Sequence, residues 1–282
     1  MADFVRFEQP VPQSCRRRDT WSRTVTPDTI EQWFARNGWT PFEFQREVWQ
    51  AYANGESGLV HAATGTGKTY AAWLGPVAEA AAMRTEEPAA KRRKRADAPP
   101  LTVLWITPLR ARAADSEQAL RAPVEHLGLG WTVESRTGDT AQSLRARQRE
   151  RLPTALVTTP ESLTLFLCRE DHAALFAQLR CVVVDEWHEL MSTKRGVQVE
   201  LALARLRALC PALRTWGLSA TLGNLAVARD TLLGRDASGA TNPGRLVRGL
   251  VPKTIEVEAL VPAQVERFPW AGHLNTKLLP EV

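Results

Sequence analysis

The sequence lacks a long hydrophobic run, a secretory leader and a paired-cysteine motif. A membrane-spanning helix needs about 18 or more consecutive apolar residues, and no stretch of the 282 residues approaches that length. The N-terminal segment has no apolar core of the kind that a signal peptide carries. The four cysteines are scattered and form no CxxC pair, which favours a reducing compartment over a disulfide or a zinc site. We therefore expect a cytoplasmic protein with no membrane partner.

The composition also lacks the extremes of non-globular chains. With 44% hydrophobic and 24% charged residues, the chain is neither disordered nor collagen-like. Its length predicts one large domain, or one domain with attachments. The net charge of +5 leans weakly toward polyanionic partners.

Short apolar segments alternate with amphipathic ones along the chain. Near-continuous apolar strands separated by helices are typical of a parallel sheet that helices cover on both faces. The sequence therefore predicts an α/β fold with a mostly parallel sheet. The expected strands are Gly58–His61, Leu101–Thr107, Trp131–Ser135, Ala155–Thr158, Cys181–Asp185 and Arg214–Ser219. The expected helices include Lys68–Met83, Arg110–Leu127 and Gln198–Leu209.

A proline-rich segment from Glu86 to Pro100 interrupts this alternation and carries five consecutive basic residues, Lys91 to Arg95. A solvated loop between a helix and a strand is one interpretation. An electrostatic contact with nucleic-acid phosphates is the other, and the sequence leaves both open.

The glycine-rich segment Ala62-Ala-Thr-Gly-Thr-Gly-Lys-Thr69 follows an expected strand and opens an expected helix. A phosphate-binding loop requires this context, because glycines let backbone N–H groups and the helix N-terminus approach an anion. Lys68 adds a positive charge, and Thr69 offers a hydroxyl ligand to Mg²⁺. The nucleotide-binding residues predicted here are Thr64, Gly65, Thr66, Gly67, Lys68 and Thr69.

An acidic pair ends the apolar strand in Val182-Val-Val-Asp-Glu-Trp-His188. Ligands of open α/β sheets bind at the carboxyl ends of strands. We predict that Asp185 holds Mg²⁺ and that Glu186 activates the water attacking the γ-phosphate.

The segment Ser219-Ala-Thr221 ends a further expected strand. Taken alone, its hydroxyls could cap the next helix. In combination with the two motifs above, Ser219 and Thr221 are predicted to couple the nucleotide state to a bound strand.

The order and spacing of these motifs resemble the DExH-box helicases of superfamily 2. Among these, the chain is most similar to the Lhr-type helicases and to their shorter relatives, the bacterial ligase-associated DNA-damage-response helicases. The segments that carry the resemblance are Gly38–Gln45, Tyr52–Gly58, Ser57–Thr69, Thr107–Asp115, Thr159–Leu163, Asp185–Leu190 and Ser219–Asn224.

This resemblance implies a RecA-like lobe of an ATP- and Mg²⁺-dependent helicase that moves 3′-to-5′ on single-stranded DNA. Its expected partners are single-stranded DNA or tailed duplexes, together with a DNA ligase and a nuclease of repair. The expected location is the bacterial cytoplasm, at the nucleoid.

The resemblance also assigns roles to single residues. Gln45 is implied to read the adenine edge, with Phe42 or Trp39 stacking near the base. His188 is implied to couple the ATP site to a second motor lobe, and is catalytic with Lys68, Asp185 and Glu186. Three loops are implied to contact DNA, with the residues Thr107, Pro108, Leu109, Arg110, Thr137, Gly138, Asp139, Thr159, Pro160 and Glu161.

The expected organisation has three parts: an extension (1–27), a RecA-like lobe (28–250), and a strand (Thr254–Leu260) with a linker toward a second lobe (251–282). Because a complete motor binds ATP between two lobes, we expect the chain to bind ATP but neither to hydrolyse it well nor to unwind DNA alone. Two alternatives stay open: a stand-alone nucleic-acid-binding P-loop module, and a P-loop ATPase that is not a helicase.

Overall fold

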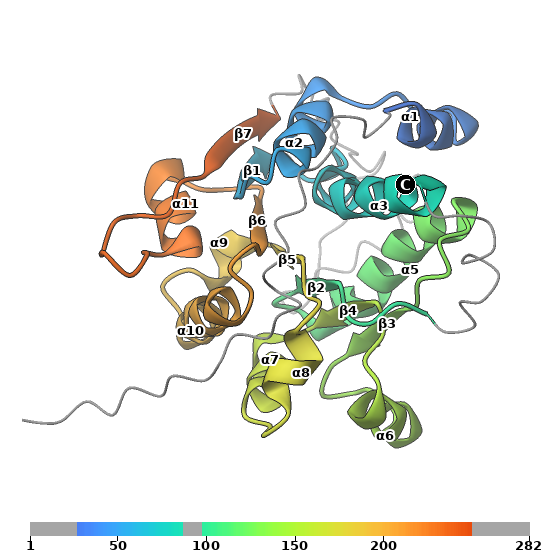
Figure 1. The fold of residues 1–282 in the computed structure, drawn as a ribbon. Helices are drawn as coiled ribbons and strands as arrows, with labels where there is room; N and C mark the ends of the chain where they lie inside the picture. Colours follow the sequence, from blue (N-terminus) through green and yellow to red (C-terminus); the bar gives the residue numbers. More distant parts are fainter. Residues whose placement is uncertain (1–26, 87–97, 250–282) are drawn as a thin grey trace, which may run out of the picture. The chain divides into compact units, whose positions relative to one another are not determined.

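A parallel sheet of seven strands organises the protein (Figure 1). The computed structural model describes residues 27–86 and 98–249. The strands are β1 (Gly58–Ala62), β2 (Val103–Ile106), β3 (Val133–Arg136), β4 (Ala155–Thr158), β5 (Cys181–Val184), β6 (Arg214–Ser219) and β7 (Arg245–Gly249).

The strand order is β3-β4-β2-β5-β6-β1-β7, and every neighbouring pair is parallel. This confirms the predicted parallel α/β fold, and all six expected strands are present. The seventh, β7, was not predicted. It pairs with β1 from Gly58 opposite Arg245 to Ala62 opposite Gly249, whereas the expected strand Thr254–Leu260 lies outside the described residues.

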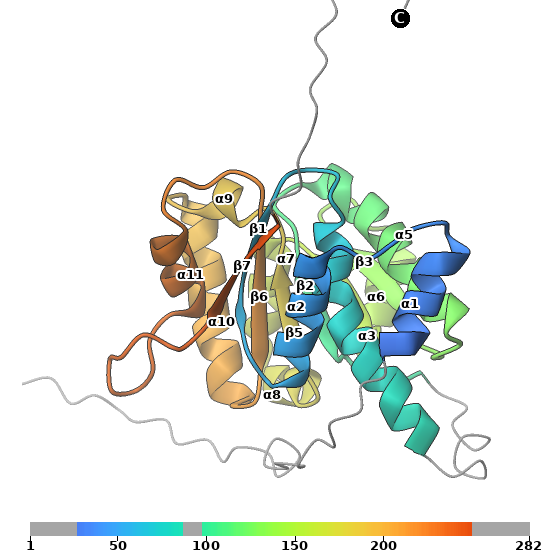
Figure 2. The ribbon, with the colours of Figure 1, turned by 90° about the horizontal axis from the view of Figure 1, so that it is seen from above.

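Helices lie on both faces of the sheet (Figure 2). On one face α3 contacts α1, α2 and α5, while α5 packs on β3 and β4. On the other face α10 contacts α7, α8, α9 and α11, and α11 packs on β1 and β6. The bounds are α1 (Pro27–Arg36), α2 (Glu43–Ala53), α3 (Lys68–Glu86), α5 (Arg110–His126), α6 (Gln142–Glu150), α7 (Pro160–Leu167), α8 (His172–Phe176), α9 (Trp187–Leu190), α10 (Lys194–Leu209) and α11 (Leu225–Leu233).

The sandwiched position explains the composition of the central strands. Every residue of β2, β4 and β5 is buried, as expected where helices cover both faces of a sheet. Helix α10 contributes Val199, Leu203 and Leu206 to the core on its side. It begins four residues before the predicted start, because the Thr193 side chain accepts a hydrogen bond from the Gly196 N–H at 3.1 Å.

Because all seven strands run in one direction, their carboxyl ends lie along one edge of the sheet. The loops that carry the sequence motifs follow β1 to β6 and therefore gather along this edge. Among the helices of 27–86 and 98–249, none combines the length and apolar character that a bilayer crossing demands.

Candidate nucleotide site and nucleic-acid interface

The glycine-rich loop joins β1 to α3 with two residues in left-handed backbone conformations. Gly65 and Gly67 both have φ of +79°, a region that glycine enters without steric cost. A Cβ at position 67 would lie 2.7 Å from Nε2 of Gln45. Glycine is therefore needed at position 67 for its conformation and for the close approach of α2.

The Lys68 side chain folds back over this loop. Its Nζ donates hydrogen bonds to the carbonyls of Ala62 (2.8 Å) and Ala63 (3.0 Å), and the residue is only 8% exposed. The Thr66 hydroxyl donates to the same Ala63 carbonyl at 2.6 Å. These contacts hold the ammonium group at the N-terminus of α3, where anions are favoured.

Gln45 joins α2 to the phosphate loop. Its Nε2 donates to the Gly67 carbonyl at 2.9 Å, and its Oε1 accepts from the Phe42 N–H at 2.8 Å. A primary amide has two N–H groups and two acceptor lone pairs, so Gln45 keeps capacity for the donor and acceptor of an adenine edge. The residue is 1% exposed, so its amide is packed between α2 and the phosphate loop in this arrangement.

Both candidates for base stacking lie at the surface. Phe42 is 42% exposed and its ring stacks on that of Phe44, with centroids 5.9 Å apart. Trp39 is 47% exposed and packs edge-on against Trp33 at 5.7 Å. The two rings stand on the segment that leads into α2, and each presents an exposed aromatic surface.

The acidic pair Asp185 and Glu186 follows β5, and Glu186 has a strained backbone. Its φ of 46° and ψ of 47° place a non-glycine residue in the left-handed region, a conformation that concentrates at functional sites. Its N–H donates to Oδ1 of Asp185 at 2.9 Å. The buried Glu186 carboxylate pairs through Oε1 with Nη1 of Arg112.

Burial, followed by the negative charge of Glu186, raises the pKa of Asp185 to about 6, while the Glu186 N–H, Arg112 and Lys68 oppose the shift. The lysine of the phosphate loop thus acts electrostatically on the acidic pair. The carboxylate is costly to ionise without a cation beside it.

The oxygen atoms of Asp185 and Thr69 are ligands of the kind that Mg²⁺ prefers. Among the described residues there is no cluster of three or more histidine, cysteine or acidic side chains suited to a metal. A site with few protein ligands fits Mg²⁺, which is commonly held by one or two protein groups together with phosphates and water. The residues present therefore fit the expected cation.

His188 connects the acidic motif to the Ser219 motif. Its Nδ1 lies 3.2 Å from the Ser219 hydroxyl and 3.6 Å from Oε2 of Glu186. The helix-cap alternative for Ser219 does not hold, because Asn224 caps α11 by accepting from the Val227 N–H at 3.1 Å. Ser219 is the fully buried last residue of β6, whereas Thr221 is exposed on the following loop.

The loops after β2 and β3 meet at the same edge of the sheet. Nη1 of Arg110 lies 3.5 Å from Oδ1 of Asp139, and a Cβ on Gly138 would lie 2.9 Å from Cζ of Arg110. Leu109, Arg110, Gly138 and Asp139 are all exposed. Two of the three loops predicted to contact DNA therefore form one continuous surface.

Burial changes the interpretation of the other loop residues. Pro108 and Pro160 are buried, as are the three threonines Thr107, Thr137 and Thr159. The Thr137 hydroxyl accepts from the Asp139 N–H at 3.2 Å, and that of Thr159 lies 3.4 Å from Ser162 Oγ. The hydroxyls cannot reach a strand on the surface in this arrangement, because they lie inside the loops that they shape.

Glu161 is exposed and faces a cation. Its carboxylate makes two contacts with the Arg195 guanidinium, at 2.6 and 3.2 Å. A bidentate pair of this kind offsets the negative charge at the start of α7, where a phosphate would otherwise be repelled.

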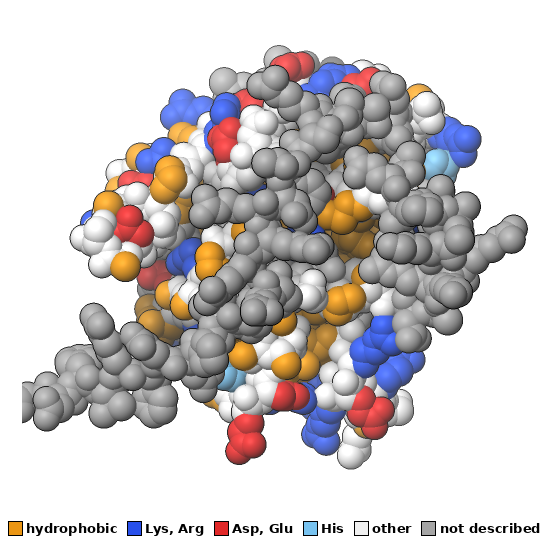
Figure 3. All heavy atoms as spheres, viewed as in Figure 1, with side chains coloured by type: hydrophobic (Ala, Val, Ile, Leu, Met, Phe, Trp, Pro, Cys, Tyr) orange, Lys and Arg blue, Asp and Glu red, His pale blue; other side chains and the backbone are white. Residues whose placement is uncertain are grey.

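The sequence analysis missed two features, a group of arginines on α6 and the single residue Arg112. Lys and Arg side chains gather over α6 in Figure 3, and Arg145 of this helix donates to the carbonyls of Thr137 (3.2 Å) and Gly138. The second is Arg112, which contacts Glu186. Their only sequence signals are the alternating arginines after Leu144 and the doubled arginine of Arg110-Ala-Arg112.

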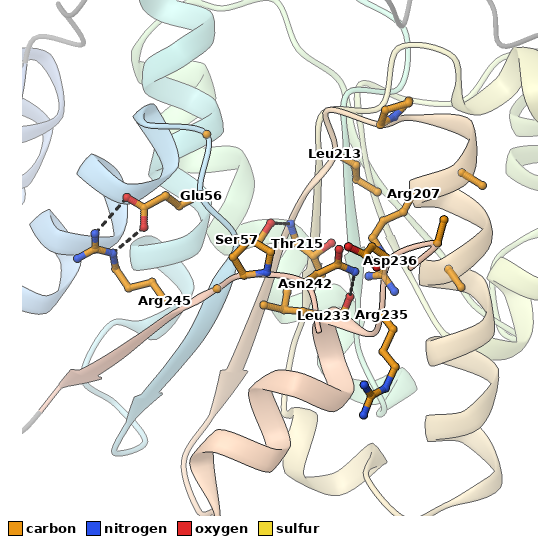
Figure 4. A pocket seen from close by; sticks show the side chains of 17 residues that line it. Glu56, Ser57, Arg207, Leu213, Thr215, Leu233, Arg235, Asp236, Asn242 and Arg245 are labelled. Atoms are coloured by element: carbon orange, nitrogen blue, oxygen red, sulfur yellow. Dashed lines mark hydrogen bonds and ion pairs between the residues drawn. The ribbon is translucent and has the colours of Figure 1, made fainter. Parts of the chain in front are cut away.

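A cavity of about 900 Å³ lies at the opposite end of the sheet (Figure 4), and no predicted site residue lines it. Its Arg245 pairs with Glu56 at 2.8 and 3.1 Å, and its Arg235 donates to the Gly239 carbonyl at 2.7 Å. The guanidinium groups of Arg235 and Arg245 are thus already paired within the protein. We therefore do not assign the nucleotide phosphates to this cavity.

Comparison with known proteins agrees with this geometry. Residues 42–228 match the DEAD/DEAH box helicase family. The Lhr helicase/probable uracil glycosylase of Mycolicibacterium smegmatis is 38% identical over 203 residues, which are 68% of this chain and 13% of that protein. The ATP-dependent helicase Lhr-Core of Methanocaldococcus jannaschii is 31% identical over 215 residues, covering 73% of this chain and 24% of that protein.

Solved structures show the same relationship. The Mycobacterium smegmatis helicase Lhr bound to ssDNA and AMP-PNP superposes with a TM-score of 0.67 and 31% identity, over 84% of this chain and 28% of that one. The DEAD-box helicase Mss116 shares the fold, with a TM-score of 0.56 and 18% identity over 73% of this chain and 39% of that one. The chain thus spans a minor part of its relatives' lengths, and it belongs to the DEAD/DEAH box helicase family as an Lhr-like first RecA-like lobe.

Proposed function

We propose that this chain is the ATP-binding first motor lobe of a 3′-to-5′ DNA helicase or translocase that acts in DNA repair. The observation that carries the proposal is the convergence of Lys68, Gln45 and the Asp185–Glu186 pair at the carboxyl edge of one sheet. The adjoining loop surface around Arg110 and Gly138 would take the DNA strand.

In this proposal each group has one task. Lys68 and the N–H groups of the loop bind the β- and γ-phosphates, while Thr69 and Asp185 hold the Mg²⁺ that neutralises their charge. Glu186 accepts the proton of the water that attacks the γ-phosphorus, and ADP leaves. His188 and Ser219, which are 3.2 Å apart, carry the nucleotide state toward a second lobe.

The lobe itself comprises residues 28–250, preceded by an extension (1–27) and followed by a connecting segment (251–282). The single-stranded DNA and AMP-PNP in the similar Lhr structure support the nucleotide and strand assignments. The expected setting is the bacterial cytoplasm at the nucleoid, with a DNA ligase and a nuclease as repair partners.

Strand displacement tests the proposal. We expect the 282-residue chain to bind Mg²⁺-ATP, measured by isothermal titration, and to leave tailed duplexes intact. Joined to a second motor lobe, it should hydrolyse ATP when single-stranded DNA is added and displace a strand from a 3′-tailed duplex but not from a 5′-tailed one.

Three results would contradict parts of this proposal. Strand displacement by the 282-residue chain alone would show that one lobe suffices. ATP hydrolysis that DNA does not stimulate would favour a P-loop ATPase that is not a helicase. DNA binding without ATP binding would favour a stand-alone nucleic-acid-binding module.

A further inference from the structure

Arg112 makes a contact that the assigned roles do not explain. It is the third residue of α5, and its Nη1 donates a hydrogen bond to Oε1 of Glu186 across the sheet edge. The arginine side chain is 44% exposed, whereas the glutamate side chain is 9% exposed. An arginine at the surface therefore reaches down to the carboxylate predicted to activate water.

Two further acidic groups lie near this pair. Asp185 and Glu189 also act on the arginine, and the hydrogen bond with Glu186 raises the pKa of Arg112. The second oxygen of Glu186, Oε2, has no hydrogen-bond partner within the described part of the chain. One carboxylate oxygen is thus engaged by a cation while the other faces His188 at 3.6 Å.

A hydrogen-bonded pair with a guanidinium fixes the direction in which a carboxylate points. As long as Arg112 holds Oε1, Glu186 is therefore less able to turn toward an attacking water.

The position of Arg112 links this contact to the loop that precedes α5. Arg110 opens the helix two residues earlier, and its side chain is 60% exposed. Leu109 is exposed beside it, and β2 behind the loop is fully buried. A strand that engages Leu109 and Arg110 would therefore contact the first turn of α5, which also carries Arg112.

We infer that Arg112 is a positioning residue that restrains Glu186 and so suppresses ATP hydrolysis until a nucleic-acid strand engages the start of α5. This inference rests on the proposed function, since it assumes that Glu186 activates water and that the loop contacts nucleic acid. It adds a reason why hydrolysis would depend on the strand.

The test measures ATP hydrolysis with and without single-stranded DNA, in the chain joined to its second motor lobe. Arg112→Gln should raise the rate without DNA roughly tenfold, the lower end of the range that one charge-assisted hydrogen bond corresponds to. The rate at saturating DNA should stay unchanged, so the stimulation ratio falls. Arg112→Lys keeps the positive charge and should retain most of the suppression.

Arg121→Gln is the matched control. Arg121 lies on the same helix and pairs with Glu117 at 2.5 Å, remote from the acidic motif, so both rates should stay at the unsubstituted values. Mg²⁺-ATP affinity of the 282-residue chain is the second readout, and Arg112→Gln should leave it unchanged.

An unchanged or lower DNA-free rate in folded Arg112→Gln protein would overturn the inference, and so would a loss of nucleotide affinity, which would make Arg112 a phosphate ligand. Glu186→Gln separates this from the proposed function. If Glu186→Gln retains hydrolysis, the proposed role of Glu186 fails; if it abolishes hydrolysis and Arg112→Gln does not raise the DNA-free rate, only the role of Arg112 fails.

Discussion

Buried charged groups have different environments at the two ends of the sheet. At the amino end, Glu79 of α3 accepts hydrogen bonds from Tyr52 of α2 at 3.0 Å and from Arg214 of β6 at 2.8 Å. The Arg214 guanidinium also lies over the Tyr52 ring, 4.1 Å from its centroid. Burial raises the pKa of Tyr52 well above its ordinary value, and the Glu79 charge adds to the shift, so the tyrosine stays neutral and donates to the carboxylate.

At the carboxyl end the acidic groups are held less completely. Glu186 has a left-handed backbone and one oxygen without a hydrogen-bond partner in the described residues, and Asp185 has its pKa raised to about 6. The network around Glu79 engages both oxygens of its carboxylate, ties two helices to a strand and stabilises the fold. The open arrangement costs stability and leaves groups ready for a ligand, the usual division between scaffold and site.

The largest predicted effect comes from breaking the network around Glu79. Glu79→Ala removes the carboxylate that pairs with the buried Arg214 and should lower the free energy of unfolding by about 3–5 kcal/mol. Urea denaturation of the 282-residue chain measures this. Glu43→Ala is the control, because its ion pair with Arg46 spans 3.9 Å and its side chain is 92% exposed. Equal effects of the two substitutions would refute the distinction between the ends.

The second prediction concerns the unfavourable burial of the ionised Asp185 carboxylate at the carboxyl end of the sheet. Below the unfolded pKa of 3.8 the contribution of Asp185 to stability is fully present, and it is lost as the pH rises through about 6. Asp185→Asn does not titrate and should therefore stabilise the nucleotide-free protein by up to about 3 kcal/mol at about pH 8, with little effect near about pH 4. Thermal unfolding at both pH values provides the measurement, and a gain of the same size at both would contradict the assignment.

The third prediction concerns the cation of the phosphate loop. Lys68→Ala should weaken Mg²⁺-ATP binding by about 10- to 150-fold, which corresponds to the loss of about 1.5–3 kcal/mol from charge-assisted hydrogen bonds. Isothermal titration is the measurement. Lys194→Ala, at the exposed start of α10, is the control and should bind ATP like the unsubstituted chain.

The smallest predicted effect separates exposed from buried residues of the strand-binding loops. Arg110→Ala should weaken single-stranded DNA binding modestly and reduce the salt-dependence slope by about one. Thr107→Val should leave binding unchanged, because the Thr107 hydroxyl is buried and has no hydrogen-bond partner in the part of the chain described. Fluorescence anisotropy over a salt series measures both, and a larger effect of Thr107→Val would reverse the assignment.

The strand and helix ends that carry the candidate nucleotide-binding residues could be predicted from the sequence, because these residues stand at set spacings. Lys68 opens a helix after a strand, and Asp185 ends one, so each has a recognisable local context. The loops for nucleic acid were harder to predict. A threonine inside a loop and one on its surface have the same local sequence pattern, and only packing distinguishes Thr107 from Arg110.

Long-range pairs escaped prediction entirely. Glu79 and Arg214 are 135 residues apart, and nothing in the local pattern of α3 indicates that Glu79 is buried. Strand β7 was missed for a related reason, because Arg245-Leu-Val-Arg-Gly249 has charged residues and becomes a strand by pairing with β1. Tertiary contacts decide the conformation of such segments more than their own propensities do.

The arginines of β7 also affect how the edge of the sheet meets other molecules. Within the described residues β7 pairs only with β1, so it stands at the end of the sheet with Arg245 and Arg248 exposed. At the opposite end, β3 carries Glu134 and Arg136. An unpaired strand edge is a template for further strands, and charged side chains discourage such pairing. Both borders of the sheet are thereby protected against edge-to-edge aggregation while the protein folds.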